Sequence, residues 1–264
     1  MNKPLISVIT VAYNAENTIE QTILSVINQT YDKIEYIIVD GGSTDGTIDI
    51  IKKYVDKITY WISESDKGIY DAMNKGIKIA SGEWICFMNC GDTFFCYTTI
   101  EDIFQRADIK SDIIYGNTRL HLSIGEYIQK GEIATDNKYM PFVHQSSFSR
   151  TSLMKKYGFD TKYKICADRN FFYTAYKNKA IFEYVDVNVS NYEAEEGVSS
   201  VNVSKVFYEK GLIEGRTSYF SWKIKYFQFI LSQRVRQFLK QILPSKFVYN
   251  FKKYKAGRRF VENK

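Results

Sequence analysis

Histidine, proline and paired cysteines are scarce in this sequence of 264 residues. It contains two His and three Pro, and none of its four Cys forms a Cys-x-x-Cys pair. Zinc sites are usually built from closely spaced Cys and His, so we expect no zinc site. Disordered linkers are commonly rich in Pro, so we also expect no long linker.

The sequence also lacks any apolar run long enough to cross a bilayer. A strand-like pattern begins within the first few residues, with no secretory leader pattern before it. We therefore expect neither a membrane span nor a signal peptide. The four Cys are then expected to remain free thiols in a reducing cytoplasm.

Acidic residues are nearly absent from one end of the chain. Residues 215–264 contain 13 Lys or Arg and one acid, Glu262, whereas residues 1–214 contain 23 basic and 29 acidic residues. Bulky apolar side chains alternate with the bases of this segment, which is typical of helices lying in a membrane interface. We predict that residues 215–264 bind an anionic membrane surface, on the inner face of the plasma membrane. The alternative is a helix packed on the protein with a solvated basic face.

Strand and helix patterns alternate through the first part of the sequence. β-branched, near-continuous apolar runs predict strands at 5–13, 34–40, 58–63, 84–88 and 112–116, with a helix between each pair. The alternation predicts an α/β fold with a mostly parallel sheet and helices on both faces. Further along we expect short strands and turns at 117–138, an extended segment at 141–150, helices at 151–157 and 167–176, a strand at 181–190, and long helices after about 201.

Polar residues follow four of the predicted strands. Ligands bind to such sheets beyond the carboxyl ends of the strands, so this edge is the predicted ligand site. The residues in question are Tyr13 and Asn14, then Asp40, Gly41, Gly42, Ser43 and Asp45, then Glu64, Asp66, Lys67 and Gly68, and finally Asn89, Gly91 and Asp92.

Several of these side chains also have a structural interpretation. Asp45 can cap the following helix, and Asp40 can close a turn. Asp71 and Lys75 have the spacing of a surface ion pair. Asp92 can likewise close a turn, with Lys67 or an Arg neutralising an anionic ligand. The residues alone leave these alternatives open.

Two segments carry a family resemblance. "PLISVITVAYNAENTIEQTILSVINQTYDKIEYIIVDGGSTDGT" and "SESDKGIYDAMNKGIKIASGEWICFMNCGD" resemble the amino-terminal half of family 2 glycosyltransferases with the GT-A fold. The closest likeness is to bacterial enzymes of exopolysaccharide, O-antigen or colanic acid synthesis. It is strong over about residues 4–95 and looser over 110–200. The family transfers a sugar from a nucleotide diphospho-sugar to an acceptor hydroxyl. The resemblance implies transfer with inversion of the anomeric configuration, to a saccharide or a polyprenyl-linked acceptor.

The resemblance also implies a domain layout and a donor site. A GT-A catalytic domain would span residues 1–200, with a nucleotide-sugar-binding half at 1–116 and an acceptor-binding half at 117–200. A basic, aromatic helical extension would follow at 201–264. Asp40 would contact the nucleotide base. The donor-binding residues by resemblance are Thr10, Val11, Tyr13, Asp40, Gly41, Asp66, Lys67, Gly68, Asn74, Asn89 and Gly91.

The metal motif departs from the family pattern. The family places Asp-x-Asp after its fourth strand, whereas this chain has Asn89-Cys90-Gly91-Asp92. Mg²⁺ and Mn²⁺ often bind through one or two carboxylates together with substrate phosphates. We therefore predict that Asp92 binds the divalent ion with the donor diphosphate, and that Asn89 supplies a weak extra oxygen or supports the site. Loss of activity, leaving a transferase-fold scaffold, is the alternative.

The second half provides the remaining catalytic candidates. By resemblance, Asp168 at the start of a helix is the base that deprotonates the acceptor, although an Asp there can also be a helix cap. His144, Gln145 and Arg169 would lie in the acceptor or sugar pocket. Rival bases are Glu193, Glu195 and Glu196.

Two other functions fit the sequence less well than sugar transfer. A nucleotidyltransferase would need a Gly-rich loop with Lys or Arg directly after the first strand, and "TVAYNAEN" has none. A nucleic-acid-binding protein could use the basic end. The acidic body and the absence of a recognised binding module disfavour it, so we expect no nucleic-acid partner.

Overall fold

The computed structural model describes residues 3–136, 138–195, 197–259 and 261–262. Its first half contains strands β1 (Ile6–Ala12), β2 (Ile34–Asp40), β3 (Tyr60–Ser63), β4 (Trp84–Phe87) and β5 (Thr93–Phe94). The helices of this half are α1 (Ile19–Ile27), α2 (Thr47–Lys53), the 3-10 turn η1 (Val55–Lys57), α3 (Ile69–Ile79) and α4 (Thr99–Arg106). The predicted alternation of strand and helix is confirmed, with β2 at the predicted bounds.

The second half contains longer strands and a helical carboxyl end. Its strands are β6 (Ile113–Leu122), β7 (Gly125–Gln129), β8 (Ser147–Arg150), β9 (Phe182–Glu193) and β10 (Val261–Glu262). Its helices are the 3-10 turn η2 (His144–Ser146), α5 (Thr151–Tyr157), α6 (Ala167–Lys177), α7 (Val198–Val201), α8 (Val203–Ile213), α9 (Phe220–Ile242) and α10 (Ser245–Arg259). None of the helices in the described part of the chain is long and apolar enough to span a bilayer.

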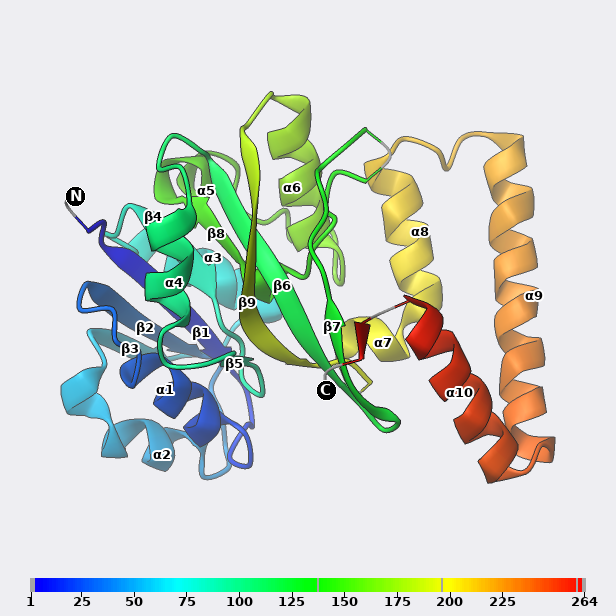
Figure 1. Ribbon diagram of the computed structural model, residues 1–264, viewed down its shortest axis with the longest axis horizontal. Coiled ribbons are helices and arrows are strands. Elements are labelled where there is room, and N and C mark those ends of the chain that lie inside the picture. The colour runs from blue at the N-terminus through cyan, green and yellow to red at the C-terminus, as the bar shows by residue number, and fades with distance from the viewer. Residues whose placement is uncertain (1–2, 137, 196, 260, 263–264) are drawn as a thin grey trace.

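The sheet is mixed rather than wholly parallel. Its main path runs β10-β7-β6-β8-β4-β1-β2-β3, and β9 pairs with both β5 and β6 (Figure 1). Strands β3, β2, β1 and β4 are mutually parallel, while β8 lies antiparallel between β4 and β6. The segment 141–150 was predicted as extended throughout, but η2 forms a turn before β8 begins. That turn brings His144 and Gln145 to the end of β4.

Helices cover both faces of the sheet because the central strands are buried on both sides. All seven residues of β1 are buried. One core cluster joins the sheet to α3, α5 and α6, and a second joins its other face to α1, α2 and α4. Alternating residues along β1, such as Val8 and Ile9, enter different clusters. This two-sided burial explains why the strands read as continuous apolar runs.

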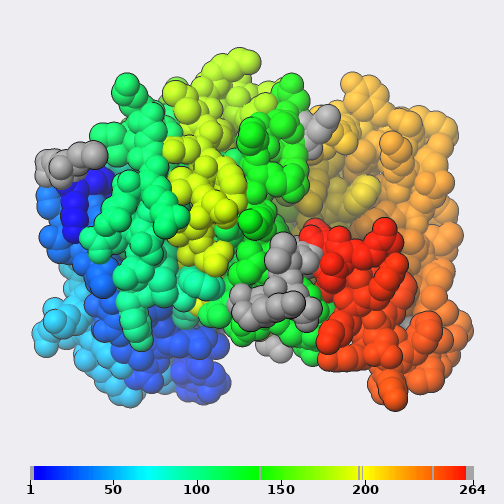
Figure 2. All heavy atoms as spheres, viewed as in Figure 1, coloured from blue at the N-terminus to red at the C-terminus, as the bar shows by residue number. Residues whose placement is uncertain are grey.

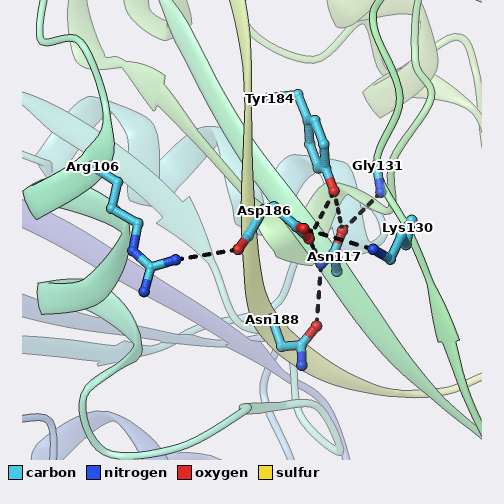
Figure 3. Close-up of polar contacts among 7 residues, drawn as sticks. All are labelled: Arg106, Asn117, Lys130, Gly131, Tyr184, Asp186 and Asn188. Atoms are coloured by element: carbon cyan, nitrogen blue, oxygen red, sulfur yellow. Dashed lines mark hydrogen bonds and ion pairs between the residues drawn. The ribbon is translucent and has the colours of Figure 1, made fainter. Parts of the chain in front are cut away.

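The fifth predicted strand continues past its expected end at residue 116. Strand β6 reaches Leu122, and its pairing with β9 is irregular beside Asn117. The buried Asn117 amide oxygen accepts from the Gly131 N–H and the Tyr184 hydroxyl (Figure 3). Its nitrogen donates to Asp186 and to another β9 side chain, Asn188. Every hydrogen-bonding position of Asn117 is thereby used, so this polar cluster fixes the path of β9.

The carboxyl-terminal helices lie at one end of the molecule, far from the first strands. Helix α8 packs on the body, with Ile213 in the same core cluster as α6. Helix α9 forms the outer edge, and α10 runs back toward the β6–β7 hairpin (Figures 1 and 2). There Ala256 packs with Ile124 and Tyr127. The helical character predicted after about residue 201 is confirmed.

Candidate active site

The loops after β1 and β2 are bonded to each other. The Asn14 N–H donates to Ser43 Oγ at 2.8 Å, and the Thr44 N–H donates to Asn14 Oδ1 at 2.9 Å. Asp45 accepts from the Thr47 N–H at the start of α2, which is the capping role weighed for it. These contacts fix the shape of the sheet edge at which ligands were predicted.

Asp40 is fully buried at the end of β2. One carboxylate oxygen accepts from the N–H groups of Gly42 and Ser43 at 3.0 and 2.9 Å, and from Ser63 Oγ at 2.6 Å. The Ser43 hydroxyl donates to the other oxygen. Asp40 therefore stabilises the Gly-rich loop, and its contact with a nucleotide base stays a prediction.

Asp66 lies against the Gly-rich loop. A Cβ built on Gly41 would be 2.4 Å from Asp66 Oδ2, so a larger residue at this position would displace the Asp66 carboxylate. The other carboxylate oxygen of Asp66 accepts from the Gly68 N–H at 2.7 Å. Lys67 between them is exposed. The predicted donor-binding residues of these two loops are thus neighbours, although no contact here identifies their ligand.

The residues predicted along β1 differ in their access to a ligand. Thr10 is fully buried, and its hydroxyl donates to the Met88 carbonyl at 2.8 Å. Val11 is also buried, whereas the side chain of Tyr13 is 65% exposed. Thr10 thus joins β1 to the end of β4, and Tyr13 presents its ring at the surface of the edge.

Asn74 is bonded to the backbone of a different segment. Its Nδ2 donates to the Phe159 carbonyl and its Oδ1 accepts from the Phe159 N–H, both at 2.8 Å. Both ends of the amide are therefore occupied in joining α3 to the segment after α5. The predicted donor contact of Asn74 would use the remaining hydrogen-bonding positions of the amide.

The Asn-Cys-Gly-Asp segment is a tight turn stabilised from α1. The Asp92 N–H donates to the Asn89 carbonyl at 3.0 Å, and Gly91 has a φ of 95°, which favours glycine. The buried Thr22 hydroxyl donates to the Asp92 carbonyl at 2.8 Å and accepts from the Gly91 N–H at 3.1 Å. Thr22 was missed in the sequence because it lies among the apolar positions of α1, where a Thr gives no distinct signal.

The Asp92 side chain is 5% exposed. Its Oδ2 accepts from Gln145 Nε2 at 2.7 Å. Burial raises the pKa of Asp92 to about 7, against the smaller lowering effects of the Gln145 hydrogen bond and of nearby His144. Near neutral pH the neutral and ionised forms of this carboxyl group are therefore both populated, and a bound cation would favour the ionised form.

A chain of polar contacts leads from Asn89 to the start of α6. Asn89 Nδ2 lies 3.2 Å from His144 Nε2, and His144 Nδ1 lies 3.4 Å from Asp168 Oδ2. The Tyr70 hydroxyl donates to Asp168 Oδ1 at 2.9 Å. The structure thus brings together four side chains, one each from the turn after β4, η2, α6 and α3.

The partners of the His144 ring define the orientation of the Asn89 amide. The Asp168 carboxylate can only accept, so His144 Nδ1 carries the proton, and neutral Nε2 accepts from Asn89 Nδ2. Asn89 Oδ1 is then directed away from the ring. It is buried without a hydrogen-bond partner, and so is Gln145 Oε1. Unpaired buried oxygens of this kind call for a ligand, a water or an ion.

Asp168 lies at the first turn of α6 and is largely buried. Burial alone would raise its pKa, but the hydrogen bonds from His144, the Arg169 N–H and the Tyr70 hydroxyl hold the pKa below the ordinary value. Asp168 is thus an ionised acceptor at neutral pH. Arg169 places its guanidinium 5.3 Å from the centre of the Tyr139 ring.

Glu209 of α8 is a buried residue that sequence reasoning missed. Its carboxylate accepts from three consecutive N–H groups, those of Lys164, Ile165 and Cys166, at 2.9, 3.0 and 2.9 Å. These residues lead directly into α6 and Asp168. A Glu on an amphipathic helix about 40 positions further along the sequence looks solvent-exposed, so only the tertiary contact shows its role.

The rival bases lie in different surroundings. Glu193 is exposed, and its backbone hydrogen-bonds to the carboxyl group of Asp92. Glu195 accepts from the Ser123 N–H at 2.7 Å and pairs with Lys252 of α10 at 2.9 Å. Glu196 lies outside the described residues. Neither of the two described rivals shares the contacts of Asp168 with His144 and Tyr70.

Comparison with known proteins identifies the family. The family model described as "Glycosyl transferase family 2" matches residues 7–184, two thirds of the chain. The chain belongs to glycosyl transferase family 2. A relative from Mycobacterium bovis, "PGL/p-HBAD biosynthesis glycosyltransferase", is 28% identical over 80% of this chain and 85% of its own length. An uncharacterized glycosyltransferase of Mycobacterium tuberculosis is 32% identical over 64% of this chain and 67% of its own.

Solved structures share the GT-A fold of this family 2 member. S. aureus TarS 1–349 in complex with UDP-GlcNAc matches with a TM-score of 0.66 and 23% identity over 80% of this chain. The mannosyltransferase PcManGT from Pyrobaculum calidifontis, in complex with GDP-Man and Mn²⁺, matches with a TM-score of 0.61 and 16% identity over 79%. The present chain spans 66% and 64% of those two chains. The GT-A expectation is confirmed, and the chain is a glycosyltransferase by family.

Proposed function

We propose that this family 2 protein transfers a sugar, with inversion, from a nucleotide diphospho-sugar to an acceptor hydroxyl. The observation that supports this most is the cluster at the ends of β4 and η2. A buried carboxyl group, Asp92, is hydrogen-bonded to Gln145 Nε2, and the amide oxygens of Gln145 and Asn89 are buried without partners. The same cluster continues through His144 to the ionised Asp168.

A divalent cation, Mn²⁺ or Mg²⁺, fits this donor set. Both ions prefer oxygen ligands, and Asp92, Asn89 and Gln145 would supply one carboxylate and two amide oxygens. No group of three or more His, Cys, Asp or Glu suited to a metal exists among the described residues, so the donor diphosphate must provide further oxygens. When bound, the ion would neutralise charge on the leaving diphosphate.

Asp168 is the proposed base. The acceptor oxygen attacks the anomeric carbon, the bond to the donor phosphate oxygen breaks, and the acceptor proton passes to Asp168. Three donors share the Asp168 carboxylate and keep it ionised before the reaction. His144 and Tyr70 contact the Asp168 carboxylate from two sides and fix its orientation. A single displacement of this kind inverts the anomeric configuration.

The acceptor is proposed to be a saccharide or a polyprenyl-linked sugar in bacterial surface polysaccharide synthesis, at the cytoplasmic face of the membrane. The basic, aromatic carboxyl end supports this setting. Tyr13 after β1 and Lys67 after β3 are both exposed, and we propose that they contact the donor. A catalytically inactive scaffold is the competing function, since the first Asp of the metal motif is replaced.

A binding and turnover screen tests the proposal. Nucleotide sugars with different bases are added with Mn²⁺ and with EDTA, and the melting temperature is measured. We expect one donor to raise it, more strongly with Mn²⁺. Donor hydrolysis or transfer should then fall roughly 10²-fold or more in Asp168→Asn while donor binding is retained. If no nucleotide sugar shifts the melting temperature, the proposed function is wrong, and binding without turnover indicates the scaffold.

A further inference from the structure

Helix α9 has an apolar stripe that faces away from the protein. Seven large side chains recur every three or four residues over its whole length, which places them on one face of the helix. All seven are exposed, with Phe220 at 76% and Phe227 at 69%. We call these residues the outer stripe: Phe220, Ile224, Phe227, Leu231, Val235, Phe238 and Ile242.

The opposite face of α9 is already occupied. Trp222, Tyr226 and Phe229 lie about half a turn around the helix from the outer stripe. Their rings contact Phe207 of α8 at centroid distances of 6.1, 5.9 and 4.5 Å. Packing on the body is therefore satisfied without the outer stripe, which lies on the outermost helix of the molecule (Figures 1 and 2).

Basic residues border the outer stripe and acids are absent. Lys223 and Arg234 each lie three residues after one stripe residue and four before another, so they are its surface neighbours. Helix α9 contains five Lys or Arg and α10 contains six, and neither contains an acid. An apolar row bordered by cations complements a surface of acyl chains beneath anionic headgroups.

A second copy of the chain would be a poor partner for this face. Two outer stripes packed together would place Lys223 and Arg234 of one copy near the same cations of the other. Neither α9 nor α10 offers a carboxylate to pair with them. Like charges brought together in this way oppose association.

We infer that the outer stripe of α9 is the surface on which the protein binds an anionic lipid bilayer, with the helix lying in the membrane interface. This inference specifies the membrane setting included in the proposed function and rests on it. Helix α9 stays packed on α8 while bound. The sheet and its active site therefore remain on the aqueous side of α9.

Point variants of the full chain test the inference. Phe227→Ser, Leu231→Ser and Phe238→Ser are combined in one protein, the stripe variant. Its matched control combines Tyr97→Ser, Ile133→Ser and Ile181→Ser, which remove exposed apolar side chains from the body. Circular dichroism and melting temperature establish that both proteins fold. Vesicles of phosphatidylcholine alone, or mixed equally with phosphatidylglycerol, are then used in flotation.

The wild type and the control should float with the mixed vesicles, more weakly as salt is raised, and the stripe variant should lose at least about tenfold in vesicle affinity. Equal binding by the stripe variant, or no binding by the wild type, would overturn the inference. A wild-type dimer that the stripe variant dissociates, measured by light scattering, would show that a second copy covers the face. Donor hydrolysis in solution is measured in parallel, so loss of membrane binding with hydrolysis retained leaves the proposed function standing.

Discussion

Replacing Asp92 by Asn should make the metal-free protein more stable, and increasingly so as the pH rises. In the folded protein, burial raises the pKa of the Asp92 carboxyl group to about 7, whereas the ordinary pKa of this group is 3.8. A raised folded pKa means that the neutral form stabilises the fold at low pH. This contribution is complete below the unfolded pKa and disappears as the pH rises through the folded pKa.

The magnitude follows from the difference between the two pKa values. A difference of roughly three pKa units corresponds to about 4 kcal/mol of unfolding free energy in total, at about 1.4 kcal/mol per unit. About 3 kcal/mol of this falls between pH 5 and pH 8, because part is already lost at pH 5. The Asn side chain is neutral at every pH, so the Asp92→Asn protein loses none of this unfolding free energy as the pH rises.

Urea unfolding in EDTA at pH 5 and pH 8 measures this effect. The stability of Asp92→Asn relative to the wild type should increase by about 3 kcal/mol between the two pH values. Asp45→Asn is the control: hydrogen bonds to Thr47 are the largest cause lowering the pKa of Asp45, so its contribution changes only in more acid solution. A constant difference for Asp92→Asn, or one that shrinks with pH, would refute the assignment of a buried, neutral carboxyl group.

Three further substitutions probe the surroundings of the site. Glu209→Gln should lower kcat by about tenfold with little change in the KM for donor, because the amide nitrogen of Gln cannot accept the N–H bond that one carboxylate oxygen receives before Asp168. An equal effect on KM in steady-state kinetics would contradict this. Asn89→Asp should reduce the Mn²⁺ concentration needed for half-maximal activity about tenfold by adding a carboxylate, and an unchanged metal titration would exclude Asn89 from the metal site. Thr22→Val should cost about 1–3 kcal/mol in urea unfolding, with Thr44→Val on the surface as the near-neutral comparison.

The local architecture was predictable because it depends on local patterns. The continuous apolar runs of β1 and β2 and the periodicity of α3 and α5 specify their type without any knowledge of their partners. The antiparallel insertion of β8 between β4 and β6 was not predictable. It depends on the pairing of β8 with β4, 62–66 residues earlier, and with β6, 32–36 residues earlier. Nothing in the ten residues from Pro141 to Arg150 records these partners.

The candidate site was predictable in part for the same reason. Asp92, His144 and Asp168 were identified as separate residues, and their connection through Asn89 became visible only in three dimensions. Glu209 has no local signature at all. For Asp40 the residue itself was identified from the sequence, but its role was left open between closing a turn and contacting a ligand. The structure shows its bonds to its own loop.

The return of the chain to the sheet after α10 has a practical consequence for protein production. Strand β10 pairs with β7, so the carboxyl end covers what would otherwise be an open sheet edge. Deleting the basic end to improve solubility would uncover this edge, remove Lys252 from Glu195 and remove Trp222 from its place against α8. A shortened protein would exchange one aggregation-prone surface for another. Surface substitutions on α9 are therefore the better route to a well-behaved sample for crystallisation.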